Sequence, residues 1–194
     1  MTTPLTAIVY HSGYGHTEVL AKAAERGAAK AGSTALIKIS AEGKITDAEW
    51  ETLNKADAII FGAPTYMGSA SGQFKVFADA SSKSWFQGLW KDKIAGGFTV
   101  SHSLSGDKLS TLQQMAILAS QHGMIWISVG LDGAQQKDTP HQRDENDLNR
   151  LGSFLGVMGQ AENAGPDVTP PQGDQKTAEH YGERIATFAK KLKN

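Results

Sequence analysis

Short runs of apolar residues recur along the chain, separated by segments in which apolar positions repeat every three or four residues. The runs are nearly continuous rather than alternating, which is typical of strands that are buried on both faces. This pattern predicts five strands, at residues 5–10, 35–39, 57–63, 94–100 and 124–129.

The segments between and after these runs have helical spacing. After the first run, one helical face is made mainly of small residues that can lie close against a sheet; it comprises Val19, Ala23, Gly27 and Ala31, with Leu20, Ala24 and Ala28 beside them. Helical spacing recurs at Trp50 and Leu53, over residues 72–80, at Leu109, Leu112, Ala116 and Ile117, and at Tyr181, Ile185, Phe188, Ala189 and Leu192. Buried strands that alternate with helices predict an α/β fold, a doubly wound sandwich with one parallel sheet between two layers of helices.

Two longer stretches interrupt this alternation. Residues 130–150 are polar and charged, and residues 163–175 are rich in turn-forming residues. Both exceed a typical connection, and long loops are usually functional or mobile. Ligands of open parallel sheets bind beyond the carboxyl ends of the strands, and the first stretch follows the fifth predicted strand. We therefore expect residues 130–150 to form a lid or a subunit contact rather than a domain boundary.

The composition narrows the classes of protein to which the chain can belong. Its 194 residues fit one domain, residues 1–194, with an ordinary 40% of hydrophobic residues. The 19 Lys and Arg residues against 20 Asp and Glu residues argue against a nucleic-acid binder, which normally carries a basic surface. There is no cysteine, which excludes disulfides, iron–sulfur clusters and thiolate catalysis. No signal peptide is recognisable, and no apolar run approaches the ~20 residues that cross a bilayer, so we expect a cytoplasmic protein without membrane insertion.

The loop after the first predicted strand can bind a phosphate. Its sequence is Ser12-Gly13-Tyr14-Gly15-His16-Thr17. A glycine-rich turn that opens a helix directs backbone N–H groups and the positive end of the helix dipole toward an anion. The hydroxyls of Ser12 and Thr17 can donate to the same anion, so no Lys or Arg is needed. The loop is not a Walker A motif, and Glu18 stands where the third glycine of a Rossmann fingerprint belongs. Taken alone, a plain strand-to-helix turn explains this loop equally well.

Two further loops follow the third and fourth predicted strands. The first, Pro64-Thr65-Tyr66-Met67-Gly68-Ser69, can present backbone amides and an aromatic edge to a planar ring. The second, Ser101-His102-Ser103-Leu104-Ser105-Gly106, offers small polar groups and one imidazole. Since parallel strands end at one edge of the sheet, the three loops together predict a site for a phosphate joined to a large, neutral heterocycle. The six histidines have no metal-ligand spacing such as HExxH, and no nucleophile elbow is present, so neither a metal nor an α/β-hydrolase is expected.

In their order along the chain, three motifs resemble those of the WrbA-type NAD(P)H:quinone oxidoreductases of the flavodoxin superfamily. The motifs are Ser12-x-x-Gly15-x-Thr17, Gly62-x-Pro64-Thr65-Tyr66-x-Gly68 and Gln121-His122-Gly123-Met124. The resemblance spans nearly the whole chain. It implies a three-layer α/β/α sandwich with a five-stranded parallel sheet of order 2-1-3-4-5.

The same resemblance implies that FMN is the cofactor and which residues hold it. The first loop would bind the FMN phosphate through Ser12, Gly13, Tyr14, Gly15, His16 and Thr17. The second would contact the isoalloxazine through Pro64, Thr65, Tyr66, Met67 and Gly68, and the third would close over the ring with Ser101, His102, Ser103 and Gly106. His122 would lie near the flavin as a cofactor contact and as the catalytic group that stabilises the reduced flavin or protonates the quinone oxygen. Trp85 and Tyr14 would line the pocket for the substrates.

This chain differs from the family pattern at several of these positions. Tyr66 and Met67 stand where the family usually has Arg and Phe, which removes a basic contact. The third loop lacks the family's glycine run, and residues 149–153 replace a glycine-rich stretch. The resemblance therefore identifies a divergent branch.

The activity implied is two-electron transfer from NADH or NADPH to a quinone-like acceptor, in a homo-oligomer (a dimer or a tetramer) whose pocket a neighbouring subunit completes. Two alternatives stay open. One is a flavodoxin-type one-electron carrier, although such carriers tend to be strongly acidic for docking and the net charge here is −1. The other is a flavin-binding regulatory scaffold without turnover. The sequence does not name the physiological acceptor or choose between NADH and NADPH.

Overall fold

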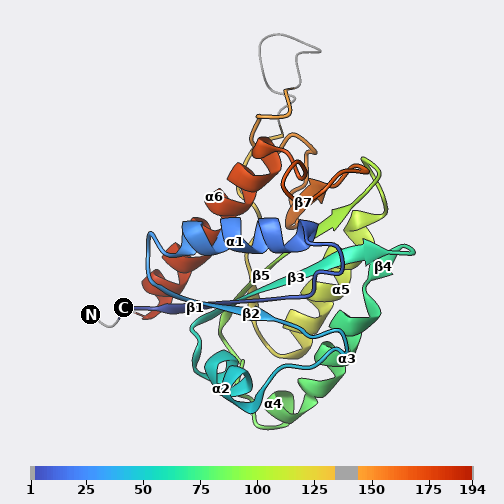
Figure 1. Ribbon diagram of the computed structural model, residues 1–194. Helices are drawn as coiled ribbons and strands as arrows, with labels where there is room; N and C mark the ends of the chain where they lie inside the picture. The colour runs from blue at the N-terminus through green and yellow to red at the C-terminus, as the bar shows by residue number, and fades with distance from the viewer. Residues whose placement is uncertain (1–2, 134–143, 194) are drawn as a thin grey trace.

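The computed structural model describes residues 3–133 and 144–193 (Figure 1). Its sheet confirms the predicted α/β class and the predicted strand order. Parallel strands lie in the order β2-β1-β3-β5-β6. Their bounds are Leu5–Tyr10 (β1), Ser33–Lys38 (β2), Ala58–Tyr66 (β3), Ile94–Ser101 (β5) and Ile125–Trp126 (β6). Two short strands were not predicted: β4 (Ser69–Ala70), which runs antiparallel to β3, and β7 (Val157–Gln160), which runs parallel to β5.

The fifth position of the sheet is divided between β6 and β7. β6 pairs only with the beginning of β5, where Ile94 faces Ile125. The end of β5 pairs with β7, from Phe98 opposite Val157 to Ser101 opposite Gln160. The prediction of one strand over residues 124–129 was therefore too long. The chain leaves the sheet after β6, and Val129 packs in the core against α6 instead.

This division corrects the expected position of residues 130–150. They were predicted to follow the carboxyl end of the fifth strand, whereas they leave the middle of the fifth position and the chain returns to it at Val157. Residues 134–143 lie outside the described residues, so the expected lid or subunit contact stays a prediction.

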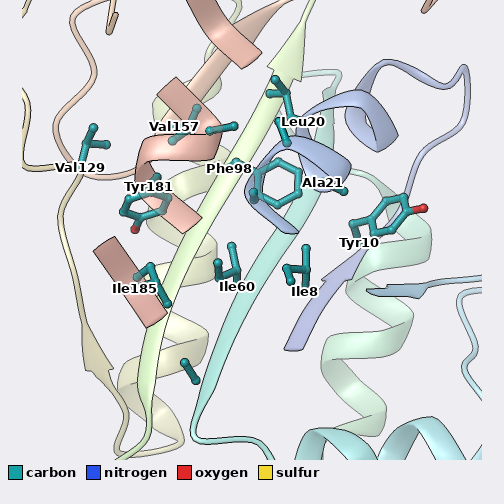
Figure 2. Packing of buried hydrophobic residues seen from close by; sticks show 14 of the residues in the cluster. Ile8, Tyr10, Leu20, Ala21, Ile60, Phe98, Val129, Val157, Tyr181 and Ile185 are labelled. Carbon is teal, nitrogen blue, oxygen red and sulfur yellow. The ribbon is translucent and has the colours of Figure 1, made fainter. Parts of the chain in front are cut away.

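Helices cover both faces of the sheet (Figure 1). On one face lie α1 (His16–Ala28) and α6 (Gln172–Lys193), and on the other lie α2 (Asp47–Lys55), α3 (Gly72–Ala80) and α5 (Lys108–Gln121). A short unpredicted helix, α4 (Ser82–Phe86), follows α3. Figure 2 shows side chains of the sheet, including Ile8, Ile60 and Phe98, packed beneath α1 and α6. Each face of the sheet thus has its own apolar core, as the continuous apolar strands predict.

The small residues of α1 permit a very close approach of α6. A Cβ atom on Gly27 would lie 1.8 Å from the carbonyl oxygen of Glu179, and one on Gly182 would lie 1.9 Å from that of Ala24. These distances are far inside van der Waals contact, so neither position accepts a side chain without moving a helix. The small face of α1 was predicted to lie against the sheet, and it serves this helix–helix contact as well.

The parallel strands all point toward one edge of the sheet, where β1, β3, β5 and β7 end. Loops that follow these four strands meet there. Within residues 3–133 and 144–193, no helix combines the length and the apolar character needed to cross a membrane.

Candidate functional site

The first loop leads from β1 into α1 through a left-handed glycine. Gly15 has φ of +93° and is the N-cap of α1, and the hydroxyl of Ser12 accepts hydrogen bonds from the N–H groups of Gly15 (3.1 Å) and Glu18 (3.3 Å). Gly15 has no side chain with which to cap the helix, and the first N–H groups of a helix have no intrahelical acceptor. The amino end of α1 thus offers N–H groups and the positive end of its dipole to an anion, as the sequence predicts.

The second loop is a tight β-hairpin between β3 and β4. Thr65 pairs with Ala70 and Tyr66 with Ser69, which leaves Met67 and Gly68 as a two-residue turn. Both turn residues have positive φ, 48° and 83°, as the type I′ hairpin turn requires. The Met67 side chain is fully exposed at the tip. The sequence predicted a turn here, and the structure shows in addition the β3–β4 pairing that fixes its conformation.

Tyrosines from the first two loops meet at the edge of the sheet. The rings of Tyr14 and Tyr66 lie edge to face with centroids 6.2 Å apart. Burial raises the pKa of the Tyr66 hydroxyl, with a further contribution from Tyr14, so this group stays protonated. A Cβ on Gly13 would lie 2.5 Å from the Tyr66 hydroxyl, so a side chain at this position would displace the Tyr66 ring.

The Thr65 hydroxyl is turned into the protein. It lies 2.8 Å from the hydroxyl of Thr99 and 2.7 Å from that of Thr111, and all three residues are buried. This cluster fixes the base of the second loop to β5 and α5. Thr65 therefore positions the loop with its hydroxyl and offers its remaining surface to the site.

The third loop is fastened by Lys108, a residue that the sequence analysis did not single out. The Lys108 ammonium donates hydrogen bonds to the Ser101 hydroxyl (2.8 Å) and to the carbonyl oxygens of Ser103 (2.7 Å) and Leu104 (2.8 Å). Its side chain is completely buried. Gly106 turns the chain into α5 with φ of +52°.

A fourth segment, residues 161–166, completes the site. The sequence predicted a long turn-rich loop over residues 163–175 but did not assign it to the site. The segment follows β7 and reaches the first loop, where His16 Nε2 lies 2.8 Å from the Ala164 carbonyl oxygen. A Cβ on Gly15 would lie 2.8 Å from the Pro166 ring, so the two segments touch at that glycine. The place of this segment at the cavity was not expected because the fifth strand was predicted to end at residue 129, whereas the strand that leads into the segment, β7, ends at Gln160.

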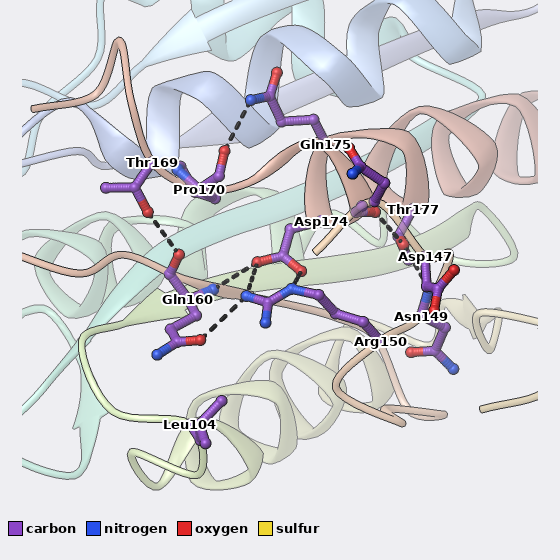
Figure 3. Close-up of polar contacts among 12 residues, drawn as sticks. Leu104, Asp147, Asn149, Arg150, Gln160, Thr169, Pro170, Asp174, Gln175 and Thr177 are labelled. Carbon is purple, nitrogen blue, oxygen red and sulfur yellow. Dashed lines mark hydrogen bonds and ion pairs between the residues drawn. The ribbon is translucent and has the colours of Figure 1, made fainter. Parts of the chain in front are cut away.

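A buried ion pair holds the fourth segment in place (Figure 3). Asp174 of α6 accepts hydrogen bonds from Arg150 Nε (2.7 Å), Arg150 Nη2 (3.0 Å) and the N–H of Gln160 (2.8 Å). Arg150 Nη2 also donates to the Gln160 side chain (3.2 Å). The Thr169 hydroxyl donates to the Gln160 carbonyl oxygen (3.0 Å), so the end of β7 is fixed from two sides.

The four segments enclose a cavity of about 510 Å³. This is within the roughly 300–1,000 Å³ range of small-molecule sites. Among the described residues that line it there is no Lys or Arg, and Glu162 supplies the carboxylate. The predicted site residues on its wall are Tyr14, His16, Thr17, Pro64, Thr65, Tyr66, Ser101 and His102.

The other predicted loop residues surround this cavity without lining it. Ser12 and Gly13 line a second cavity of about 570 Å³ on the other side of the two tyrosines, beside Lys38. The remaining predicted residues shape the loops at the helix cap and in the turns. They are Gly15, Met67, Gly68, Ser103 and Gly106. The amino end of α1, the left-handed glycine at its cap and a wall in which Glu162 is the one carboxylate among the described lining residues suit a phosphate with an attached flat heterocycle, so the residues present fit FMN.

Trp85 and His122 do not join the three loops within one chain. α5 begins beside the third loop and is 14 residues long, so His122 at its other end is about 21 Å away along the helix. The Trp85 indole donates to the Gln121 carbonyl oxygen (3.0 Å), which places it beside His122. Both residues line a separate groove of about 330 Å³ between α3 and α5.

His122 is packed as a neutral imidazole. Its ring stacks on Trp90 with centroids 4.2 Å apart, and its Nε2 lies 2.9 Å from the Ser81 hydroxyl. Burial lowers its pKa to about 4. Within one chain, His122 therefore packs in the core beside Trp90 and contacts neither the cavity nor the loops around it. In the described part of the chain, no three His, Asp or Glu side chains are grouped as metal ligands.

Known proteins resemble the chain over most of its length. The family model for NADPH-dependent FMN reductase matches residues 11–134. The flavodoxin FldP of Pseudomonas aeruginosa is 45% identical over 185 residues, which cover 95% of this chain and 96% of FldP. An NAD(P)H dehydrogenase (quinone) of Archaeoglobus fulgidus is 32% identical, with 95% and 97% covered. The crystal structure of a WrbA-like flavodoxin from Agrobacterium tumefaciens superimposes with a TM-score of 0.78 at 43% identity and covers 97% of this chain and 99% of that one.

Proposed function

The chain belongs to the NADPH-dependent FMN reductase family and is of the WrbA-type, flavodoxin-like kind, and on that premise we propose that it is an FMN-dependent oxidoreductase. In this proposal residues 1–194 form one FMN-binding domain. It takes two electrons from NADH or NADPH and passes them to a quinone-like acceptor.

The observation that carries the proposal is the cavity at the carboxyl edge of the sheet. It joins the amino end of α1 to loops from three further strands, and its lining among the described residues has no Lys or Arg. A phosphate site made of N–H groups and hydroxyls, continuous with a cleft without Lys or Arg among its described lining residues, favours a flavin over a nucleoside triphosphate.

We assign the roles of the chain's residues from this geometry. The phosphate is held by the N–H groups at the start of α1 with the Ser12 and Thr17 hydroxyls, while Tyr66 and His102 contact the ring from opposite loops. FMN supplies the redox chemistry, and the protein orients it and excludes water. The exposed ring of Tyr14 is placed to stack against an incoming nicotinamide or quinone.

Trp85 and His122 take part in this proposal only across a subunit interface. The family resemblance implies an oligomer in which a neighbour completes the pocket, and one chain holds both residues in a groove away from its own cavity. We propose that they approach the flavin of a neighbouring copy, in a dimer or a tetramer.

The test begins with the absorption spectrum of the purified protein and its change on anaerobic mixing with NADH and with NADPH. We expect flavin bands that leave the protein on denaturation and bleach with one of the nucleotides, followed by recovery on addition of benzoquinone. Flavin that neither nucleotide bleaches would refute the oxidoreductase.

A flavodoxin-type one-electron carrier is the second candidate, and the 45% identity to a protein named flavodoxin favours it. It predicts slow bleaching by both nucleotides but rapid, stepwise reduction by a partner reductase. Tight FMN binding with neither behaviour would favour the regulatory scaffold.

A further inference from the structure

Lys108 is a fully buried lysine, and no carboxylate of residues 3–133 or 144–193 forms an ion pair with it. Its three hydrogen bonds go to one hydroxyl and two carbonyl oxygens of the third loop, those of Ser101, Ser103 and Leu104. These acceptors satisfy all three donors of an ammonium group but leave its charge unneutralised. Burial consequently lowers the pKa of Lys108 to about 8, and the group is mainly charged at neutral pH.

The charged groups near Lys108 do not neutralise its positive charge. Asp174 favours the charged form of Lys108 and Arg150 opposes it, and these two residues form an ion pair with each other at 2.7 Å. Figure 3 shows this pair above Leu104 of the third loop. Asp107, the residue before Lys108, is exposed, so water screens its charge.

The ammonium lies directly behind the wall of the proposed flavin cavity. Ser101 lines that cavity, and its hydroxyl accepts a hydrogen bond from Lys108 at 2.8 Å. No Lys or Arg lies among the described lining residues, so the positive charge of Lys108 acts on the cavity from behind the third loop, through Ser101.

We propose that Lys108 is a positioning residue that makes the site prefer the reduced, negatively charged form of FMN over the oxidised form. The inference rests on the proposed function. Reduced flavin carries a negative charge near neutral pH, so a fixed cation behind the ring raises the midpoint potential of the bound cofactor and favours hydride uptake from NADH or NADPH. Lys108 keeps its proton throughout this step.

The size of the effect follows from the burial of the charge. If the ring of a bound flavin lay about 10 Å from the Lys108 ammonium, the unit charge would change the equilibrium between reduced and oxidised flavin roughly tenfold at an effective dielectric constant of about 20. A tenfold change in the preference for reduced over oxidised flavin shifts a two-electron midpoint potential by about 30 mV.

Three variants of the FMN-loaded protein test the proposal, with spectroelectrochemical titration of the flavin between pH 6.5 and 9.5. Lys108→Met removes the charge, and Lys108→Arg keeps it but cannot lose it in this pH range. Lys93→Met is the matched control, because Lys93 also donates to two carbonyl oxygens and its pKa is also lowered to about 8 by burial, but it lies at the opposite edge of the sheet.

We expect Lys108→Met to weaken the preference for reduced over oxidised flavin about tenfold, which lowers the midpoint potential by about 30 mV. Lys93→Met should leave the potential unchanged. The wild-type plot of potential against pH should bend near pH 8, and Lys108→Arg should remove the bend while keeping the neutral-pH potential. A Lys108→Met protein with the wild-type potential overturns the inference, as does a wild-type plot without a bend if the variant does not fold. Failure of the proposed function is distinct, because the wild-type protein would then lack FMN or resist reduction by both nucleotides.

Discussion

The contact between α1 and α6 gives the sharpest prediction for stability. We expect Gly27→Ala to destabilise the protein, although alanine favours a helix interior over glycine by about 1 kcal/mol. The new Cβ would lie 1.8 Å from the Glu179 carbonyl oxygen, whereas ordinary contact begins at 3.4 Å. That oxygen belongs to the backbone of α6, so no side-chain rotation relieves the overlap and the helices must separate by about 1.5 Å.

Overpacking of this kind costs about 1–3 kcal/mol, occasionally more, and a rigid backbone neighbour places it at the upper end. After the gain in helix propensity, a net loss on the order of 2 kcal/mol is expected, equivalent to roughly 4–8 °C in Tm for a chain of this size. Equilibrium unfolding in urea, followed by circular dichroism, measures the loss as a lower midpoint with an unchanged slope.

Gly72→Ala is the matched control, because a Cβ at this helical position has no atom within 4 Å. It should leave the free energy of unfolding unchanged or raise it by a few tenths of a kcal/mol. If Gly27→Ala were as stable as Gly72→Ala, the helices would adjust without cost and the argument from close packing would be refuted.

Three further predictions concern the ion pair, a buried imidazole and the phosphate loop. Asp174→Ala leaves the Arg150 guanidinium buried without its partner and should cost about 3–5 kcal/mol in urea unfolding; a loss below about 1 kcal/mol would show that Arg150 rotates to solvent. Burial lowers the pKa of His122 from 6.5 to about 4, so the unfolded chain binds more protons between these values and stability falls as pH drops from 6.5 toward 4, by about 3 kcal/mol. The plot of the free energy of unfolding against pH should be flatter over this range for His122→Gln than for the wild-type protein. Identical slopes of the two plots would contradict the low pKa of His122. Gly15→Ala should weaken FMN binding, measured by flavin fluorescence, about tenfold or more because it meets Pro166 at 2.8 Å, whereas Gly88→Ala, also at positive φ but in open space, should not.

Much of the fold could be predicted because its strands are continuous apolar runs. β1 and α3 have the predicted bounds, since each has clear polar or glycine residues at its ends. β7 was missed because Val157-Met158-Gly159-Gln160 is short, contains glycine and alternates weakly. Its identity as a strand depends on pairing with β5, which lies far away in the sequence, and local pattern carries no information about that pairing.

The site was predicted only where it is formed by loops that follow predicted strands. Loops at the ends of predicted strands were found, but residues 161–166 follow a strand that was not. Lys108 stands beside Asp107 in a polar stretch, where lysine normally faces solvent, and only the tertiary fold shows that the third loop wraps around it. The resemblance matched Trp85 and His122 to positions in the family, but a sequence match cannot say whether such residues serve their own chain or a neighbouring one.

A cytoplasmic location also stays a prediction.

Because the fifth position of the sheet is divided, one wall of the cavity can open independently of the rest of the sheet. β6 and β7 occupy one position in the sheet but belong to separate stretches of chain, and only β7 continues into residues 161–166. Release of β7 from β5 and of Gln160 from Asp174 would open one side of the cavity while β6 and the other strands stay paired. Such a local opening requires less free energy than global unfolding. Opening of this side of the cavity therefore does not require the whole sheet to unfold, because only the pairing of β7 with β5 and the contact of Gln160 with Asp174 close it.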